Sequence, residues 1–288
     1  MSKTKKISLI QMNTTDDVHS NFASFQSGII KAAEIGSDFI LTPEVTNLIT
    51  LDHKKRIALS TTEDEDIFLE EAKRLCLKYS VWILLGSLVI RDKRQSKCAN
   101  RSFLIDPSGN IKARYDKIHM FDISLSKQEQ YKESDYYNQG NVAQIINTEI
   151  GNIGMSICYD LRFPTLFNQM AINGANILVV PSAFTYTTGQ KHWEILLRAR
   201  AIENGCFVLA PAQCGSHDRA SRRVSYGNSM IISPWGEILN KLSDKPGICT
   251  HNINICESSE YRKKIPNIKN ISNYSMVTIN TLKIPNNV

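Results

Sequence analysis

The sequence has no apolar stretch long enough to cross a lipid bilayer. Its longest hydrophobic runs, residues 81–90 and 177–181, reach at most about half of the roughly 20 residues that a membrane-spanning helix needs. The N-terminus is basic but leads directly into a strand pattern, without the apolar core or the small-residue cleavage site of a signal peptide. We therefore expect a cytoplasmic protein that does not bind membranes.

The sequence also lacks the spacings that are typical of metal sites and of disulfide frameworks. It has seven cysteines, an odd number, with no C-x-x-C pair, and its six histidines form no H-x-x-x-H pair. Most of the cysteines are therefore interpreted as small buried hydrophobic residues of a reducing compartment. We expect neither a metal nor an organic cofactor.

Charge of one sign is not concentrated in any long segment. The chain of 288 residues carries 34 Lys and Arg against 28 Asp and Glu, a net charge of +6 spread over its length. The basic clusters are short, namely Arg219, Arg222 and Arg223 near Tyr226, and residues 262–264. No aromatic-basic recognition motif accompanies them. An RNA-binding protein stays an alternative that salt-sensitive retention on RNA would reveal, but nucleic acid is not the expected partner.

Strand and helix signals alternate along the chain without a Pro/Gly/Ser-rich linker. Apolar runs predict strands over 6–11, 39–41, 81–90, 99–105, 111–114, 153–157, 177–180 and 207–210. Capping and periodicity predict helices over 18–35, 63–79, 164–173 and 192–204, hairpins at 149–152 and 233–236, and a short helix near the end. The pattern predicts one α/β domain with mixed strand pairing over residues 1–270, followed by a tail over 271–288.

Cys158 differs from the other cysteines in its position. It ends an apolar strand in the segment GMSICYDLRFP (154–164), in which Pro164 opens a helix. A residue at such a strand-to-helix turn exposes its side chain, and the next backbone N–H, that of Tyr159, faces a substrate oxygen. Cys158 is thus a candidate nucleophile, with a buried structural thiol as the alternative.

A nucleophilic cysteine needs a proton acceptor and a positive group for the developing oxyanion. Glu44 directly follows the buried strand 39–41, where desolvation is expected to raise its pKa toward the range of a general base. Lys117 lies just past another predicted strand. Either residue could instead form a surface ion pair, because spacing does not show that they converge on Cys158.

A Cys-His hydrolase is the nearest enzymatic rival. His119, His192 or His217 would then activate the thiol as the base.

Glu44, Lys117 and Cys158 occur in the order and approximate spacing of the carbon-nitrogen hydrolase family, the nitrilase superfamily, which the sequence resembles from residue 7 to about 239. The resemblance implies a four-layer α-β-β-α sandwich that assembles into homodimers or larger homo-oligomers. It implies that Cys158 forms a thioester, that Glu44 accepts its proton, and that Lys117 stabilises the oxyanion with the Tyr159 backbone N–H. The family's second glutamate matches Glu133, as an auxiliary residue that positions Lys117; a solvated loop carboxylate is the alternative.

The residues after the nucleophile separate the branches of this superfamily. Cys-Tyr-Asp at 158–160 resembles the amidases, whereas nitrilases usually show Cys-Trp-Glu, and PSAF at 181–184 with AQCG at 212–215 resembles the deaminated glutathione amidases. This implies hydrolysis of a small carboxylate-bearing amide to an acid and ammonia. The alternatives are an omega-amidase acting on 2-oxoglutaramate or 2-oxosuccinamate, an N-carbamoyl amino acid amidohydrolase, and an inactive nitrilase-like scaffold.

The expected substrate carboxylate suggests a binding residue. Arg162 lies about one turn beyond Cys158 and would hold the carboxylate, with Phe184 and Thr188 in a loop walling the same pocket. A structural pairing of Arg162 with an acidic neighbour such as Asp160 is the alternative. Asn228 stands where the family usually carries His, on a predicted core strand, so we expect an altered hydrogen bond near the site.

Overall fold

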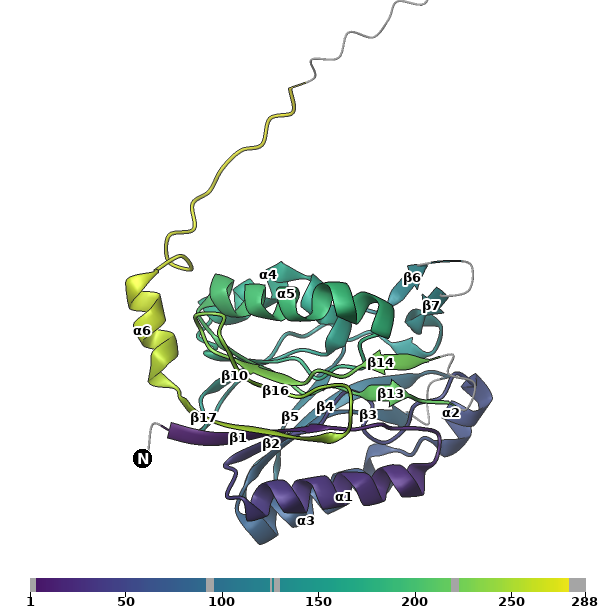
Figure 1. Cartoon of the computed structure of the whole chain (residues 1–288). Helices are drawn as coiled ribbons and strands as arrows, with labels where there is room; N and C mark the ends of the chain where they lie inside the picture. Colours follow the sequence, from purple (N-terminus) through teal and green to yellow (C-terminus); the bar gives the residue numbers. More distant parts are fainter. Residues whose placement is uncertain (1–3, 92–95, 125, 127–129, 219–222, 280–288) are drawn as a thin grey trace, which may run out of the picture.

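Two β-sheets lie face to face in the middle of the molecule, and helices cover the outer face of each sheet (Figure 1). The protein is described here by a computed structural model that covers residues 4–91, 96–124, 126, 130–218 and 223–279. Helices α1 (Val18–Glu34) and α3 (Ile67–Tyr79) flank the first sheet, while α4 (Pro164–Ile172) and α5 (Tyr186–Asn204) flank the second. The predicted four-layer α-β-β-α sandwich in a single α/β domain is confirmed.

The first sheet has the strand order β17-β1-β2-β3-β4-β5, with β8 paired to β4. β1, β2 and β3 run parallel, whereas β17, β4 and β5 join antiparallel to their neighbours, so the pairing is mixed as predicted. Its strands are β1 (Thr4–Gln11), β2 (Phe39–Leu41), β3 (Trp82–Arg91), β4 (Cys98–Ile105), β5 (Ile111–Asp116), β8 (Tyr137–Asn138) and β17 (Gly247–Asn254).

The second sheet has the order β16-β15-β12-β11-β10-β9, with a parallel centre and antiparallel edges. Its strands are β9 (Ile145–Asn147), β10 (Asn152–Met155), β11 (Ile177–Val179), β12 (Phe207–Ala210), β15 (Met230–Ile232) and β16 (Ile238–Lys241). Two short ribbons complete the described strands, namely β6 (Asp122–Ser124) with β7 (Gln130–Lys132) and β13 (Cys214–Ser216) with β14 (Val224–Tyr226).

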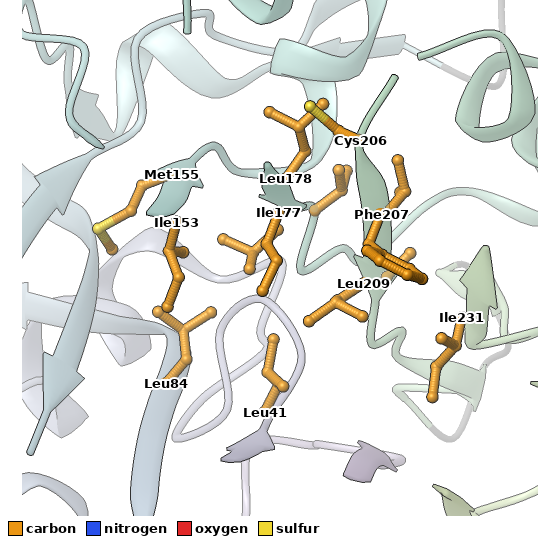
Figure 2. Packing of buried hydrophobic residues seen from close by; sticks show 14 of the residues in the cluster. Leu41, Leu84, Ile153, Met155, Ile177, Leu178, Cys206, Phe207, Leu209 and Ile231 are labelled. Atoms are coloured by element: carbon orange, nitrogen blue, oxygen red, sulfur yellow. The ribbon is translucent and has the colours of Figure 1, made fainter. Parts of the chain in front are cut away.

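Successive residues of the first sheet point into two different hydrophobic layers. In β3, Leu84 belongs to the core between the sheets, whereas Ile83 packs in the layer beneath α1 and α3. Figure 2 shows Leu84 opposite Ile153 of β10 in the layer between the sheets. Because both faces of the central strands are buried, their sequences read as continuous apolar runs.

The structure differs from the sequence-based prediction at several element boundaries. Helix α5 begins at Tyr186, six residues before the predicted start, so that Thr188 lies on a helix and not in a loop. The predicted helix over 63–79 is a 3-10 turn followed by α3, because the Asp66 side chain accepts hydrogen bonds from Phe68 N and Leu69 N and caps the helix there. β10 ends at Met155, before the predicted strand end.

Several elements were not predicted, among them α2, β17 and the short strands β6, β7, β8 and β13. Helix α2 (His53–Leu59) is short and has a single buried residue, so it has no apolar period. β17 pairs antiparallel with β1 along its whole length, a contact between opposite ends of the chain.

Helix α6 (Cys256–Lys264) is followed by a segment that extends away from the body of the molecule (Figure 1). The described part of this segment holds no helix or strand. The division of the chain at residue 270 stays a prediction. None of the described helices is both long and apolar enough to cross a membrane.

Candidate active site

The three predicted catalytic residues come from strand ends in both sheets. Glu44 follows β2 and Lys117 follows β5 in the first sheet, while Cys158 opens a 3-10 segment (Cys158–Arg162) just after β10 in the second. All three side chains are buried and line one cavity. The three side chains therefore converge on one cavity, which their spacing in the sequence did not show.

The Lys117 ammonium lies between two carboxylates. Its Nζ donates to Glu44 Oε1 at 2.8 Å and to the two carboxylate oxygens of Glu133 at 3.0 and 2.8 Å. Glu133 also accepts from the Phe121 backbone N–H at 2.7 Å, and only 13% of its side chain is exposed. Glu133 is thus no solvated loop carboxylate but a mostly buried partner of Lys117.

Both oxygens of Glu44 are held by hydrogen bonds. Oε2 accepts from the Ala183 backbone N–H at 2.7 Å, and Oε1 accepts from Asn100 Nδ2 at 2.9 Å as well as from Lys117. Asn100 also donates to Glu133 Oε1 at 3.2 Å, so it bridges the two carboxylates. Asn100 was not predicted for the site, because it lies beside the polar residues Arg101 and Ser102 in β4 and nothing in the sequence distinguishes it from them.

The charges of this cluster hold the thiol neutral and the carboxylate ionised. Burial and the negative charge of Glu44 raise the pKa of Cys158 well above its ordinary value, and nearby Lys117 only partly opposes them. Burial alone would raise the pKa of Glu44, but the charge and hydrogen bond of Lys117 outweigh it and the pKa is lowered. The predicted upward shift for Glu44 is therefore wrong, because the prediction left out the counter-charge.

The pKa of Lys117 moves in the opposite direction to that expected from burial. Burial would lower the pKa, but the negative charges of Glu133 and Glu44 outweigh it and raise the pKa well above its ordinary value. At rest, the cluster therefore consists of the Cys158 thiol, the Glu44 and Glu133 carboxylates and the Lys117 ammonium.

Of the four described non-glycine residues with a positive φ, two lie at the candidate base and the candidate nucleophile, whereas Ser80 and Asn228 lie elsewhere. Cys158 and Val45, the residue after Glu44, have φ angles of +49° each, in the left-handed region that non-glycine residues avoid. A residue held there costs about 1–3 kcal/mol and persists only where its surroundings fix it. Val45 N donates to Ser87 Oγ at 2.7 Å, and Cys158 N donates to the Pro181 carbonyl at 2.9 Å.

A glycine lets the two sheets approach closely at this point. A Cβ atom on Gly86 in β3 would overlap the carbonyl oxygens of Thr42 and Pro43 and the Cβ of Pro181. Thr42 and Pro43 lead to Glu44, and Pro181 holds the backbone of Cys158. Gly86 thus allows the segments that carry Glu44 and Cys158 to lie close together, which no local sequence signal indicated.

Asp160 ties the turn of Cys158 to the segment of Lys117. Its fully buried carboxylate accepts from Tyr115 Oη at 2.7 Å and from Ile157 N at 2.8 Å. It also accepts from His119 N at 3.0 Å, and the His119 ring nitrogen Nδ1 lies 2.7 Å away. The segments that carry Lys117 and Cys158 are therefore held together by one carboxylate, which the sequence offered only as a possible partner of Arg162.

The catalytic cluster opens into a cavity of about 190 Å³. Tyr159, Phe184 and Thr188 line it, as predicted for the last two. Two arginines that were not predicted for the site also line it, namely Arg56 of α2 and Arg223 just before β14. The wall of the cavity therefore combines aromatic surface with positive charge.

Arg162 is not among the residues that line this cavity. Its guanidinium lies over the Phe184 ring at 5.3 Å and over the Tyr159 ring at 5.8 Å, and its Nη2 lies 3.3 Å from His192 Nδ1. Neither the predicted open pocket position nor the alternative pairing with Asp160 is observed. Arg162 instead lies against two aromatic side chains of the cavity wall.

The histidines of the rival mechanism have other partners. His217 Nδ1 donates to the Thr14 carbonyl and its Nε2 accepts from Ser225 Oγ, each at 2.7 Å. Burial lowers the pKa of His217 to about 4, so the ring is neutral. His119 is stacked on Phe163 with ring centroids 3.5 Å apart. None of the three candidate histidines lines the cavity with Cys158.

The basic clusters have structural partners where they are described. Arg219 and Arg222 lie outside the described residues, whereas Arg223 donates to the Ala183 carbonyl and lies over the Tyr131 ring. Arg262 donates to the carbonyls of Ala175 and Asn204 and so fixes α6 to the body.

Asn228 lies in the turn between β14 and β15, not on a strand as predicted. Its φ of +59° suits asparagine, and its side chain donates to the Tyr226 carbonyl at 2.8 Å. Its carbonyl accepts from Trp193 Nε1 at 2.9 Å. Asn228 thus closes a turn and does not line the cavity.

No group of three or more His, Cys, Asp or Glu in the described part of the chain is arranged to hold a metal ion.

Residues 6–263 match the family model for carbon-nitrogen hydrolases. A deaminated glutathione amidase of Yersinia enterocolitica is 39% identical over 244 residues, which are 84% of this chain and 84% of that protein. A deaminated glutathione amidase of Dictyostelium discoideum is 36% identical and covers 96% of this chain and 97% of that protein.

The nitrilase and fragile histidine triad fusion protein NitFhit of Caenorhabditis elegans is 36% identical over 90% of this chain, and the match spans 59% of the fusion protein. Its crystal structure superposes with a TM-score of 0.88 at 34% identity, covering 94% of this chain and 65% of that one. The structure of Nit3 from Saccharomyces cerevisiae, at 24% identity, shares the fold with a TM-score of 0.81 over 91% of this chain and 94% of that one.

Proposed function

The chain belongs to the carbon-nitrogen hydrolase family, and we propose on this premise that Cys158, Glu44 and Lys117 are its catalytic triad. Family and amidase-named relatives make it a hydrolase of non-peptide carbon-nitrogen bonds. The observation that carries the triad is one buried ammonium held by two carboxylates beside a buried thiol. Such a cluster supplies a nucleophile, a proton acceptor and a cation in contact.

In the first half of the reaction, the sulfur of Cys158 bonds to the amide carbon while its proton passes to Glu44. The transfer accompanies the attack, because the raised thiol pKa and the lowered carboxylate pKa disfavour a thiolate at rest. Lys117 and the Tyr159 backbone N–H stabilise the oxyanion. Glu44 then delivers the proton to the leaving nitrogen, the carbon-nitrogen bond breaks, and a thioester remains on Cys158.

In the second half, water attacks the thioester carbon and gives a proton to Glu44. The carbon-sulfur bond breaks, the acid leaves, and the proton returns to the sulfur of Cys158. Glu133 and Asn100 serve as positioning residues, since they contact Lys117 and Glu44 and hold both in place through each half.

The substrate we propose is a small amide that carries a carboxylate, of the kind named for the relatives, deaminated glutathione. In that compound the amide nitrogen belongs to cysteinylglycine, so hydrolysis releases this dipeptide and 2-oxoglutarate. Ammonia, which the sequence analysis expected, is released only from a primary amide, as in the omega-amidase and N-carbamoyl alternatives. The assay must therefore measure the acid product.

Two arginines are candidates to hold the carboxylate. Arg162 is the residue suggested by its position about one turn beyond Cys158, and its guanidinium lies over the Phe184 and Tyr159 rings, outside the cavity lining. Arg223 is supported by its place in the cavity lining. In either case Phe184 and Thr188 form the wall beside the acyl group. Arg162→Lys and Arg223→Lys, tested on charged and neutral amides, separate the two, because the binding residue raises KM for the charged amide selectively.

A substrate panel tests the proposed function. Deaminated glutathione, 2-oxoglutaramate, 2-oxosuccinamate and an N-carbamoyl amino acid are incubated with the enzyme and with Cys158→Ala, and the acid product is measured. We expect the highest kcat/KM for deaminated glutathione and no turnover by Cys158→Ala. Preference for a primary amide would reassign the branch, and no turnover of any compound would favour an inactive scaffold.

We also propose that the protein is a cytoplasmic homodimer. Ile195 and Ile202 lie seven residues apart on α5 and are 69% and 42% exposed, so one side of this helix presents apolar surface to solvent. Light scattering should give a dimer for the native chain, and Ile195→Asp should shift it toward the monomer. A monomeric native protein would contradict this proposal.

A further inference from the structure

Arg56 is a buried cation without an anionic partner. Only 7% of it is exposed, and it lines the same cavity as Cys158. Its Nη2 donates to the Thr50 carbonyl at 2.6 Å, but its Nη1 is buried and has no hydrogen-bond partner. No carboxylate in the described part of the chain lies within ion-pair distance of its guanidinium.

The aromatic neighbours of Arg56 do not compensate its charge. The guanidinium carbon lies 4.7 Å from the Tyr136 ring centre and 5.5 Å from that of Tyr137. Burial raises the pKa of Tyr137 to about 12, so this phenol is neutral. The rings fix the plane of the guanidinium but leave its positive charge in place.

Arg200 shows how a buried arginine is normally satisfied in this chain. It is 4% exposed and also stacks on an aromatic ring, that of Phe167. Its Nη1 pairs with Glu203 at 2.8 Å, and its Nε and Nη2 donate to the Leu161 carbonyl. Arg200 does not line the cavity. Of the two arginines that are more than nine-tenths buried in the described part of the chain, Arg56 and Arg200, the one with an unpartnered nitrogen therefore lies on the cavity wall.

A buried charged nitrogen without a hydrogen-bond partner in the protein is costly, and an unsatisfied group of this kind calls for a ligand. The cavity wall around Arg56 includes the apolar residues Leu48, Ile49 and Leu51, which weaken the screening of any charge that enters. A planar guanidinium with a free nitrogen is suited to a carboxylate.

We infer that Arg56 binds a second carboxylate of the substrate, in addition to the one proposed for Arg162 or Arg223. The preferred substrate is then an amide that carries two carboxylates. This inference rests on the proposed function, since it concerns the amide bound in the same cavity. It makes Arg56 a specificity-determining residue that takes no part in bond breaking.

The test compares deaminated glutathione with its analogue in which the glycine carboxylate is a methyl ester, and with the analogue in which the other carboxylate is esterified. Arg56→Lys keeps the charge and loses the planar geometry, whereas Arg56→Met removes the charge. We expect each variant to raise KM for the dicarboxylate by about 10- to 100-fold, as for a hydrogen bond between charged groups. Turnover number should stay within about twofold, and one of the two esters should be nearly unaffected.

Arg200→Lys is the matched control, because it alters an equally buried arginine outside the cavity, and it should leave the discrimination between acid and ester unchanged. If the Arg56 variants do not fold, Leu51→Glu replaces a residue that is 42% exposed and directly follows Thr50, the hydrogen-bond partner of Arg56. The introduced carboxylate should compete for Arg56 and raise KM for the dicarboxylate selectively.

Binding measured without turnover tests the role of Arg56 separately from the proposed hydrolysis. In Cys158→Ala, calorimetry with deaminated glutathione should show an affinity that Arg56→Lys reduces by the same factor. Selective weakening supports the inference even if the native enzyme prefers another amide. Equal losses for the acid and both esters, or no loss for any of them, would overturn it whatever the enzyme hydrolyses.

Discussion

The same cavity contains two buried cations whose surroundings differ. Lys117 is surrounded by the carboxylates of Glu44 and Glu133, and its donors are all engaged. Arg56 has a carbonyl, two neutral rings and an unpartnered nitrogen. A compensated charge fixes the protonation states of its neighbours and so serves the chemistry. An uncompensated charge on a cavity wall is available to a ligand.

The largest expected effect concerns the catalytic cluster. Cys158→Ala should lower kcat/KM on the order of 10⁴-fold or more, because no other group supplies the nucleophile. Lys117→Met should lower it by about 10²- to 10³-fold through loss of the oxyanion cation. Steady-state kinetics with circular dichroism as a folding control measures both. A Cys158→Ala protein that keeps a few per cent of the activity would refute the proposed nucleophile.

A substitution at Gly86 tests how much the activity depends on the spacing of Glu44 and Cys158, because it changes no charge. Gly86→Ala leaves every charged group in place but pushes apart the segments that carry Glu44 and Cys158. We expect kcat to fall more than tenfold and the free energy of unfolding to fall by about 1–3 kcal/mol, the usual cost of overpacking. Gly247→Ala is the control, since a Cβ there meets only ordinary contacts with the side chain of Leu242. Normal activity in Gly86→Ala would show that the close approach is not needed.

Asn100 should have a smaller effect, on kcat and not on KM. Asn100→Leu removes one hydrogen bond from each of Glu44 and Glu133 but keeps Lys117 between them. We expect kcat to fall by about tenfold, equivalent to one hydrogen bond to a charged group. The acid limb of the pH–rate profile should shift to higher pH, because Glu44 loses a donor that lowers its pKa. An unchanged pH profile would mean that Asn100 is merely structural.

The smallest effect on the rate is expected from a change in pH, which should act on stability instead. His217 has a pKa of about 4 in the fold against 6.5 when unfolded, so the unfolded chain binds the proton more readily. The free energy of unfolding should therefore fall as pH drops below 6.5, by up to about 3 kcal/mol near pH 4. The kcat/KM of the folded enzyme should hold over most of this range, since the lowered pKa of Glu44 keeps it ionised. Urea titrations at several pH values and initial rates measure the two separately. Parallel loss of rate and stability from pH 6.5 would contradict the assignment of Glu44 as the base.

Comparing the two cations also shows what the sequence could predict. Glu44, Lys117 and Cys158 follow apolar strands and match a known family order, so the sequence could propose them, and the structure brings them to one cavity. The direction of the Glu44 pKa was predicted wrongly, because it depends on an ammonium that is 73 residues away in the chain. The role of Gly86 likewise depends on Pro181 from the other sheet.

Arg56 lies in a short helix with no apolar period, and neither its burial nor its missing partner has a local signal. Thr188 was selected correctly as a cavity residue, although its helix was predicted to begin later. Functional residues at strand ends can thus be predicted from the sequence. Whether a buried charge has a partner cannot, because this depends on contacts between distant segments.

The central claim is that hydrolysis passes through a thioester on Cys158, and partitioning with hydroxylamine tests it most directly. Two amides with the same acyl group and different leaving amines are hydrolysed in the presence of hydroxylamine, and the ratio of hydroxamate to acid is measured. A common acyl-enzyme predicts the same ratio for both amides, rising linearly with hydroxylamine, and no product with Cys158→Ala. Ratios that differ between the two amides, or acid alone at every hydroxylamine concentration, would contradict the account.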